Sequence, residues 1–297
     1  MRNLFQQVTD EILAAIESGT EDFSMPWHAS GLGLPSNAIS GRAYRGVNTL
    51  LLWARARSCA YRSARWATYR QWAAAGAQVR KGETSTTVLF WKGVANEEGD
   101  STSAADCGNR PRFIARAFRV FNADQLDGAD EPTIAQLGDD QRIQAVDQFF
   151  ARLPATIWHG GDCAFYDVRA DLVSMPGFGS FRRPEGFYST LAHELVHWSG
   201  ANHRLGRDLK NRFGTEAYAM EELIAELGAA FLGAQLGLAV EPRRDHAPYI
   251  ASWLKVLRDD PRAIVTAASK AQIAVNYILE LAGTAEPAVF DSAEHAA

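Results

Sequence analysis

A five-residue motif in the second half of the chain limits most strongly what this sequence can fold into. Residues 193–197 spell HELVH, within a run from Tyr188 to Trp198 that has the character of a single helix. Because an α-helix turns by about 100° per residue, His193 and His197 lie roughly 40° apart on one face, where both imidazoles can bind one metal ion. Glu194 lies on the adjacent face and can accept a proton from water instead of binding the ion. The motif therefore predicts a metal site with its own acid–base group.

The HExxH motif resembles that of zincin metallopeptidases, which require a third protein ligand, and the sequence offers three candidates. Residues 215–235 predict a long helix on which Glu222 and Glu226 share a face. This arrangement resembles that of gluzincin peptidases, so we favour Glu222 as the ligand and Glu226 as the group that orients a ligand histidine. Glu226 is itself the second candidate ligand. His203 is the third, because HELVHWSGANH matches the metzincin spacing HExxHxxGxxH.

Zinc is the metal that the motif favours, and Mn²⁺ is an alternative because histidine and carboxylate ligands bind both ions. The expected reaction is peptide-bond hydrolysis, with Glu194 as the catalytic base. Tyr218 and His203 are both candidate donors to a developing oxyanion. The segment 171–176 precedes the metal-binding helix, and we expect it to be an exposed strand that pairs with an extended peptide.

The charge of the chain is unevenly distributed, which indicates a second function. Residues 40–95 contain ten Lys or Arg and one acid, Glu83, so this segment carries +9 and the remainder −14, against a total of −5. The same segment, called the basic block below, contains eight aromatic residues. Cations can contact phosphates while aromatic rings stack on unpaired bases, a combination typical of proteins that bind single-stranded nucleic acid. A protein-interaction face and an ordinary charged surface are the alternatives.

The best candidates for nucleic-acid contacts in the basic block flank predicted turns or strand ends, where side chains are accessible. They are Arg42, Tyr44, Arg45, Arg65, Trp66, Arg80, Lys81 and Lys92. Trp53 and Trp72, in contrast, lie within predicted helices, and we expect both to be buried.

The order of predicted helices and strands favours an α+β fold with two domains. We expect residues 1–123 to form a small α+β nucleic-acid-binding domain and residues 124–140, which are acidic and contain Gly and Pro, to form a linker. Residues 141–283 predict a mainly helical zincin-like metallopeptidase domain with a small antiparallel sheet, and residues 284–297 a disordered tail. The sequence lacks an apolar stretch typical of a signal peptide or a membrane span, so we expect a cytoplasmic protein without membrane contacts.

Short motifs in both halves of the chain together resemble a known family. They include PW at 26–27, YRGVN at 44–48, VRKGE at 79–83, YSTLAHELVH at 188–197 and EEL at 221–223. In this order they resemble ArdC-type antirestriction proteins, whose N-terminal domain is shared with certain plasmid primases. The resemblance extends from about residue 3 to residue 282.

This resemblance implies a protein of a conjugative plasmid that binds single-stranded DNA and protects incoming DNA from host restriction. It also implies a protease-like second domain, with a host restriction protein or another DNA-bound protein as the candidate substrate. The alternative is a DNA-coating protein whose metal site is structural and not proteolytic.

Overall fold

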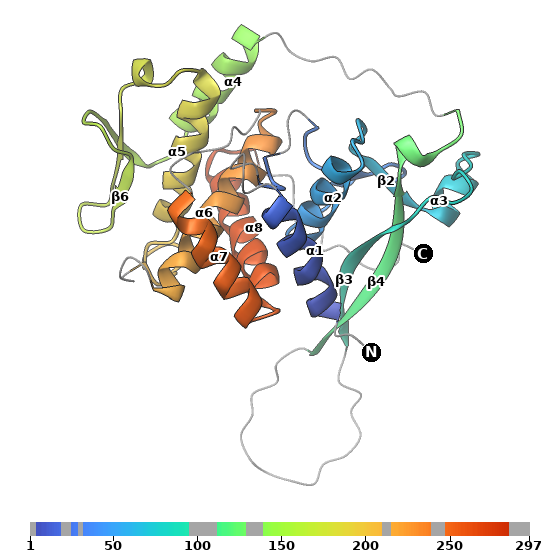
Figure 1. Ribbon diagram of the computed structural model, residues 1–297. Helices are drawn as coiled ribbons and strands as arrows, with labels where there is room; N and C mark the ends of the chain where they lie inside the picture. Colours follow the sequence, from blue (N-terminus) through green and yellow to red (C-terminus); the bar gives the residue numbers. More distant parts are fainter. Residues whose placement is uncertain are drawn as a thin grey trace.

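The structure is a computed structural model that describes residues 4–18, 25–28, 32–94, 112–128, 139–209, 215–238 and 247–284. These residues form helices together with two small sheets, which confirms the predicted α+β class (Figure 1). Among them, no helix combines the length and hydropathy that crossing a membrane requires.

In the described residues, the first half of the chain builds a four-stranded sheet and three α-helices. In chain order its elements are α1 (Leu4–Ser18), β1 (Ser36–Asn37), α2 (Val47–Ser58), β2 (Arg65–Thr68), α3 (Tyr69–Ala74), β3 (Thr86–Val94), β4 (Arg112–Asn122) and the 3₁₀ helix η1 (Ala123–Gln125). The strand order is β1-β2-β4-β3, with β3 and β4 forming a long antiparallel pair. Helix α2 is fixed to β3 by Asn48, whose side chain donates to the carbonyl of Leu89 and accepts from its N–H, both at 2.7 Å.

The second half is mainly helical. Its elements are α4 (Asp139–Ala151), β5 (Thr156–His159), β6 (Phe165–Asp167), β7 (Leu172–Met175), the 3₁₀ helix η2 (Phe178–Ser180), α5 (Pro184–Ser199), α6 (Glu216–Gln235), α7 (Ala247–Asp259) and α8 (Ala263–Leu281). Helices α5, α6 and α8 pack on one another, and β6 and β7 cover another face of α5.

The small sheet of the second half differs in two ways from the prediction. Its order is β5-β7-β6, and β7 pairs parallel with β5 and antiparallel with β6, so the sheet is mixed and not antiparallel. The difference arises because β6 and β7 form a hairpin while β5 joins the far side of β7. Since β7 is the central strand, the segment 171–176 has no open edge for a peptide, and that expectation was wrong.

The two halves share one hydrophobic core. Helices α1 and α2 lie between the four-stranded sheet and the helices of the second half (Figure 1). The ring of Trp53 in α2 packs 5.9 Å from that of Phe231 in α6, and Thr9 of α1 donates to the carbonyl of Pro261 at 2.7 Å. The predicted linker falls largely on residues 129–138, which lie outside the described residues, as do residues 285–297 of the predicted tail, so these boundaries stay predictions.

Candidate metal centre

Helix α5 carries the HExxH motif and is almost completely buried. It begins with Pro184 at its first turn, a position that tolerates the missing N–H of proline. Leu195 and Val196 are fully buried, so the two apolar residues of the motif anchor the helix in the core. His193 and Glu194 are buried as well, while His197 is half-buried. The motif is therefore held on a rigid element.

Helix α6 brings the acidic residues to this motif. Thr215 caps the helix by accepting a hydrogen bond from the N–H of Tyr218 at 3.2 Å. Gly228, which follows Glu222 on the same helix, faces Val196 of α5 and lets the two helix backbones approach closely. The small residues at this contact place the carboxylate of Glu222 opposite the two imidazoles.

Three side-chain donors form a compact group in the described part of the chain: His193, His197 and Glu222. The Nε2 atoms of the two histidines are 3.2 Å apart, and each lies 3.5 Å from one oxygen of Glu222. Donors that surround a tetrahedral ion at about 2.05 Å are separated by about 3.3 Å. The donor set and its spacing therefore fit a divalent metal ion.

The charge of Glu222 also suits a metal ligand. Burial raises the pKa of this carboxyl group, but the imidazoles of His193 and His197 and a hydrogen bond from Tyr218 outweigh burial and lower the pKa to about 2. The Tyr218 hydroxyl lies 3.3 Å from that of Tyr249. Burial, followed by this contact and by the charge of Glu222, raises the pKa of Tyr218, so it stays protonated and can donate a hydrogen bond.

A carboxylate holds the outer side of His197. Its Nδ1 lies 3.2 Å from Oε1 of Glu221, and the guanidinium of Arg207 donates to both oxygens of Glu221 at 3.0 to 3.2 Å. Burial raises the pKa of Glu221, but the hydrogen bonds to His197 and Arg207 outweigh it and hold the pKa below its usual range. The space for the guanidinium exists because residue 200 is glycine, where a β-carbon would lie 2.7 Å from Arg207.

The outer side of His193 faces a second carboxylate. Its Nδ1 lies 3.7 Å from Oε2 of Glu226, which is the place predicted for a group that orients a ligand histidine. The other oxygen of Glu226 is contacted by Trp27 and His28 from the first half of the chain, at 3.2 and 3.0 Å. Sequence reasoning missed Glu221, Arg207, Trp27 and His28. Only Glu221 had a local signal, as the neighbour of Glu222.

His203, the candidate ligand of the metzincin alternative, is remote from this group of donors. Its side chain is 63% exposed, and its Nε2 lies 3.3 Å from Asp171. Gly200, which the metzincin spacing assigns to a turn, instead makes room for Arg207. The geometry therefore favours Glu222 over His203 as a partner of the two histidines.

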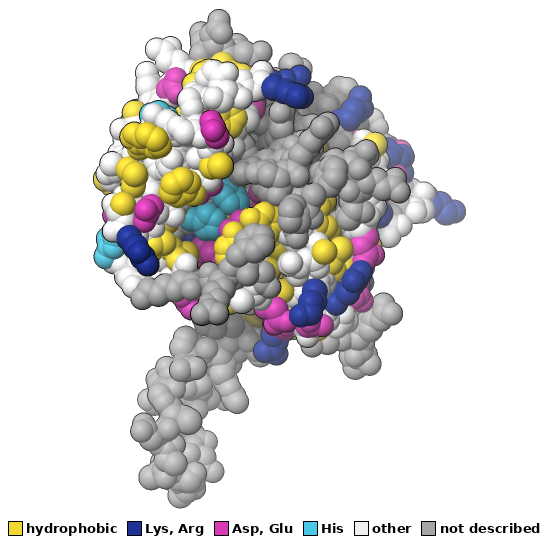
Figure 2. All heavy atoms as spheres, turned by 60° about the vertical axis from the view of Figure 1, so that its left-hand side comes forward, with side chains coloured by type: hydrophobic (Ala, Val, Ile, Leu, Met, Phe, Trp, Pro, Cys, Tyr) yellow, Lys and Arg dark blue, Asp and Glu magenta, His cyan; other side chains and the backbone are white. Residues whose placement is uncertain are grey.

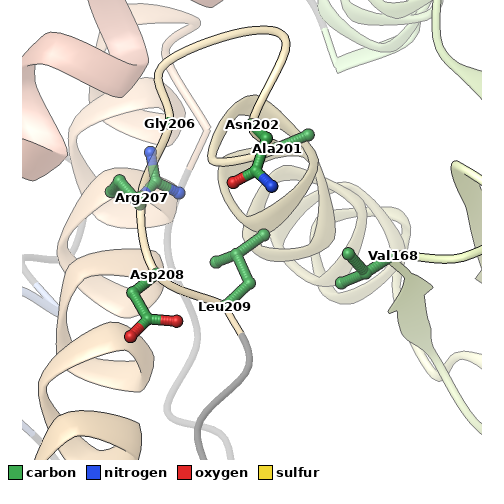
Figure 3. A pocket seen from close by; sticks show the side chains of 7 residues that line it. All are labelled: Val168, Ala201, Asn202, Gly206, Arg207, Asp208 and Leu209. Atoms are coloured by element: carbon green, nitrogen blue, oxygen red, sulfur yellow. The ribbon is translucent and has the colours of Figure 1, made fainter.

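The candidate metal centre is partly open to solvent, since the side chains of His197 and Glu222 are each 13% exposed. Figure 2 shows histidine side chains on the floor of a hollow, with acidic side chains beside them and hydrophobic side chains around them. A separate pocket of about 200 Å³ lies between the end of α5 and the segment 206–209, and is lined by Val168, Ala201, Asn202, Gly206, Arg207, Asp208 and Leu209 (Figure 3). Arg207 lines this pocket while its guanidinium donates to Glu221, so the pocket borders the residues that contact His197 from behind and not the three candidate ligand atoms.

Two of the predicted nucleic-acid contacts are buried in the structure. Tyr44 is 5% exposed and Trp66 1% exposed, and both belong to a core cluster with Leu52 and Val88. Their rings pack within this cluster, so neither offers a face to a base. These two predictions were wrong because aromatic residues at strand ends can close a core as readily as they can project from it.

The predicted cations differ in their surroundings. Arg42, Arg45 and Lys81 are exposed. Arg65 is half-buried, with its guanidinium 6.0 Å from the ring centroid of Trp72. Arg80 donates to Glu83 and to the carbonyls of Asp124 and Leu126, and its side chain is 44% exposed, so its contact with a phosphate stays a prediction. The side chain of Lys92 lies outside the described residues.

Two other aromatic residues of the basic block project into solvent. Tyr69, at the start of α3, is 50% exposed, and Trp91 of β3 is 42% exposed. Trp53 and Trp72 are buried, as predicted. Exposed rings and exposed cations are thus both present in the basic block, although the rings are at other positions than the sequence suggested.

Two family models match the chain, one in each half. The N-terminal domain of anti-restriction factor ArdC matches residues 2–121, and a zincin-like metallopeptidase model, MPTase-PolyVal, matches residues 144–270. The metal-free crystal structure of the antirestriction protein ArdC from plasmid R388 is 37% identical, has a TM-score of 0.78, and is aligned over 96% of this chain and 99% of its own. This chain belongs to the ArdC family of antirestriction proteins.

Further relatives are also similar to this ArdC-family chain. The Mn(II)-bound structure of the R388 protein, also 37% identical, has a TM-score of 0.77 over 96% of this chain and 100% of its own. Protein y4eC of Sinorhizobium fredii is 48% identical over 91% of this chain and 89% of its own length. DNA primase TraC of Escherichia coli is 35% identical over 92% of this chain, but the chain spans only 27% of that primase. The family resemblance and the zincin-like second domain expected from the sequence are thereby confirmed.

Proposed function

We propose that this ArdC-family chain is an antirestriction protein of a conjugative plasmid, with a single-stranded-DNA-binding first half and a zinc-dependent metallopeptidase centre in the second. The observation that carries the enzymatic part is the group of His193, His197 and Glu222 with Glu194 next to it on α5. Its most suitable substrates are proteins bound to incoming DNA, such as a host restriction protein. Such an action takes place in the cytoplasm of the cell that receives the DNA.

Each residue has a defined role in this proposal. His193, His197 and Glu222 hold the ion, which when bound supplies the Lewis acidity that polarises a peptide carbonyl and activates water. Glu194 takes the proton of the attacking water and passes it to the leaving amine. Tyr218, which stays protonated and donates to Glu222 in the free protein, redirects its single O–H toward the oxyanion. Zinc suits two imidazoles and a carboxylate, and manganese is the alternative, supported by the Mn(II)-bound R388 relative.

The DNA-binding part is supported by the charge of the basic block and by its exposed side chains. Arg42, Arg45 and Lys81 offer positive charge, and Tyr69 and Trp91 offer exposed rings. Phosphate contacts by cations and stacking by aromatic rings together permit binding that does not depend on base sequence. A protein that protects DNA of any sequence requires this tolerance.

Substitution of Glu194 by glutamine tests the enzymatic part. Glutamine preserves the size of the buried side chain and removes its ability to accept a proton, so we expect normal metal content and loss of peptidase activity. Glu216→Gln, at an exposed position at the start of α6, is the matched control. The biological measurement is the frequency of plasmid transfer into a restricting host relative to a non-restricting one. Full protection by a folded, metal-loaded Glu194→Gln protein would contradict the need for catalysis and favour a DNA-coating role.

A further inference from the structure

A short segment from the first half of the chain reaches the rear of the proposed metal centre. Met25, Trp27 and His28 are buried, although they lie in the sequence far from the HExxH helix. Trp27 packs on Trp253 of α7 with the ring centroids 6.1 Å apart. Its indole N–H and the His28 imidazole both contact Oε1 of Glu226, at 3.2 and 3.0 Å. The segment 25–28 therefore belongs to the surroundings of a residue that faces a metal ligand.

The hydrogen bonds determine which nitrogen of His28 carries the proton. The backbone N–H of Met25 donates to Nδ1 of His28 at 3.0 Å, so Nδ1 must accept. The proton of the neutral ring therefore resides on Nε2, which points at Glu226. Since an indole nitrogen is also only a donor, Oε1 of Glu226 receives two hydrogen bonds from the segment 25–28.

These two donors fix the orientation of the Glu226 carboxylate. With Oε1 held, Oε2 is directed at Nδ1 of His193, 3.7 Å away, while Nε2 of His193 faces His197 and Glu222. A metal ion on Nε2 requires the proton of the His193 ring to be on Nδ1, opposite this carboxylate. Carboxylates in this place orient the imidazole and increase its basicity.

We propose that Trp27 and His28 are positioning residues for the metal ligand His193, acting through Glu226. The proposal rests on the proposed metal centre and extends it, because the first half of the chain then supplies part of that centre. His197 is supported differently, since Glu221 and Arg207 both come from the second half. The metal affinity of the second half consequently depends on the docked segment 25–28.

The test measures the affinity of the metal-free full-length protein for Zn²⁺, by competition with a chromophoric chelator, and the visible spectrum of the Co²⁺-loaded protein. His28→Ala removes one donor to Glu226, and we expect an affinity about 10- to 100-fold lower and an altered Co²⁺ spectrum. His28→Gln retains an N–H donor at a similar reach, so it should restore most of the affinity. His203→Ala removes an exposed histidine that is remote from the donors and is the matched control.

Trp27→Phe gives a second measurement, because it removes the indole N–H and keeps a ring in the core; we expect a weaker affinity here too. If His28→Ala does not fold, this variant decides. A folded His28→Ala or Trp27→Phe protein with the affinity and Co²⁺ spectrum of the wild type would overturn the positioning role. Failure of the wild type itself to bind Zn²⁺ would overturn the proposed metal centre, and the positioning role with it, which is a distinct outcome.

Discussion

A β-carbon at Gly228 of α6 would lie 2.6 Å from Cγ2 of Val196 in α5. The two helices therefore touch at a position where α6 has no side chain. Gly228→Ala should push the helices apart. Overpacking of this kind costs about 1–3 kcal/mol, of which the better helix propensity of alanine recovers about 1. We expect a lower melting temperature and weaker metal binding. Gly186→Ala in α5, where the new carbon would meet only Phe181 at 3.6 Å, is the control and should be neutral or stabilising.

The three candidate ligands give different results when each is substituted singly. Glu222→Gln should abolish stoichiometric metal binding, because an amide oxygen replaces a charged ligand whose pKa is lowered to about 2. Glu226→Gln should retain the ion with reduced affinity, and His203→Ala should leave it unchanged. Metal analysis of the purified, folded variants is the measurement. Unchanged metal content in Glu222→Gln would remove this residue from the ligand set.

Acidification should release the ion through the imidazoles and not through the carboxylates. The lowered pKa values of Glu221 and Glu222 keep both groups ionised from about pH 8 to about pH 5. Metal binding requires neutral imidazoles, so affinity decreases as the pH falls, by up to about two log units per pH unit for two histidines. Calorimetry across this range measures the slope. If the affinity stayed the same down to about pH 5, this would contradict the participation of both histidines.

The DNA-binding proposal predicts a specific response to salt. Each cation that neutralises a phosphate of single-stranded DNA contributes about 0.7 to the slope of log K against log salt. We therefore expect Arg45→Ala and Lys81→Ala to weaken binding and to make it less salt-dependent, and Tyr69→Ala to weaken it without changing the slope. Fluorescence anisotropy with a labelled oligonucleotide is the assay. Lys255 is an exposed cation of the second half that pairs with Glu216, so Lys255→Ala should have no effect. Binding whose affinity does not change with salt concentration would refute the proposal.

The parts of the candidate metal centre that are close in sequence could be predicted, and the parts that are distant in sequence could not. His193, Glu194 and His197 are fixed by helical periodicity, and Glu222 followed from a second helix with small residues at its contact face. The support of His193 by Trp27 and His28 depends on the docking of α1 and its neighbouring segment on α7, for which the sequence contains no periodic signal. Tertiary packing alone brings these residues together.

In the basic block, the composition predicted which kinds of side chain are exposed better than it predicted which individual residues are exposed. Tyr44 and Trp66 flank predicted turns, a position that favours exposure, but their rings fill the space between α2 and the sheet. Arg80 is a predicted phosphate contact, and its guanidinium also donates to Glu83 and to the carbonyl of Asp124 in η1. For aromatic and arginine side chains, whether the group projects or packs depends on neighbours that a single sequence does not identify.

The hydrophobic core that runs from α1 and α2 into α6 and α8 constrains how such a protein can evolve. Recombination that replaced one half would expose the apolar faces of the other, including those around Trp53 and Phe231. The alignment with the much longer TraC primase accordingly includes 92% of this chain, with both halves together. Both halves can therefore occur together as one unit inside a longer relative.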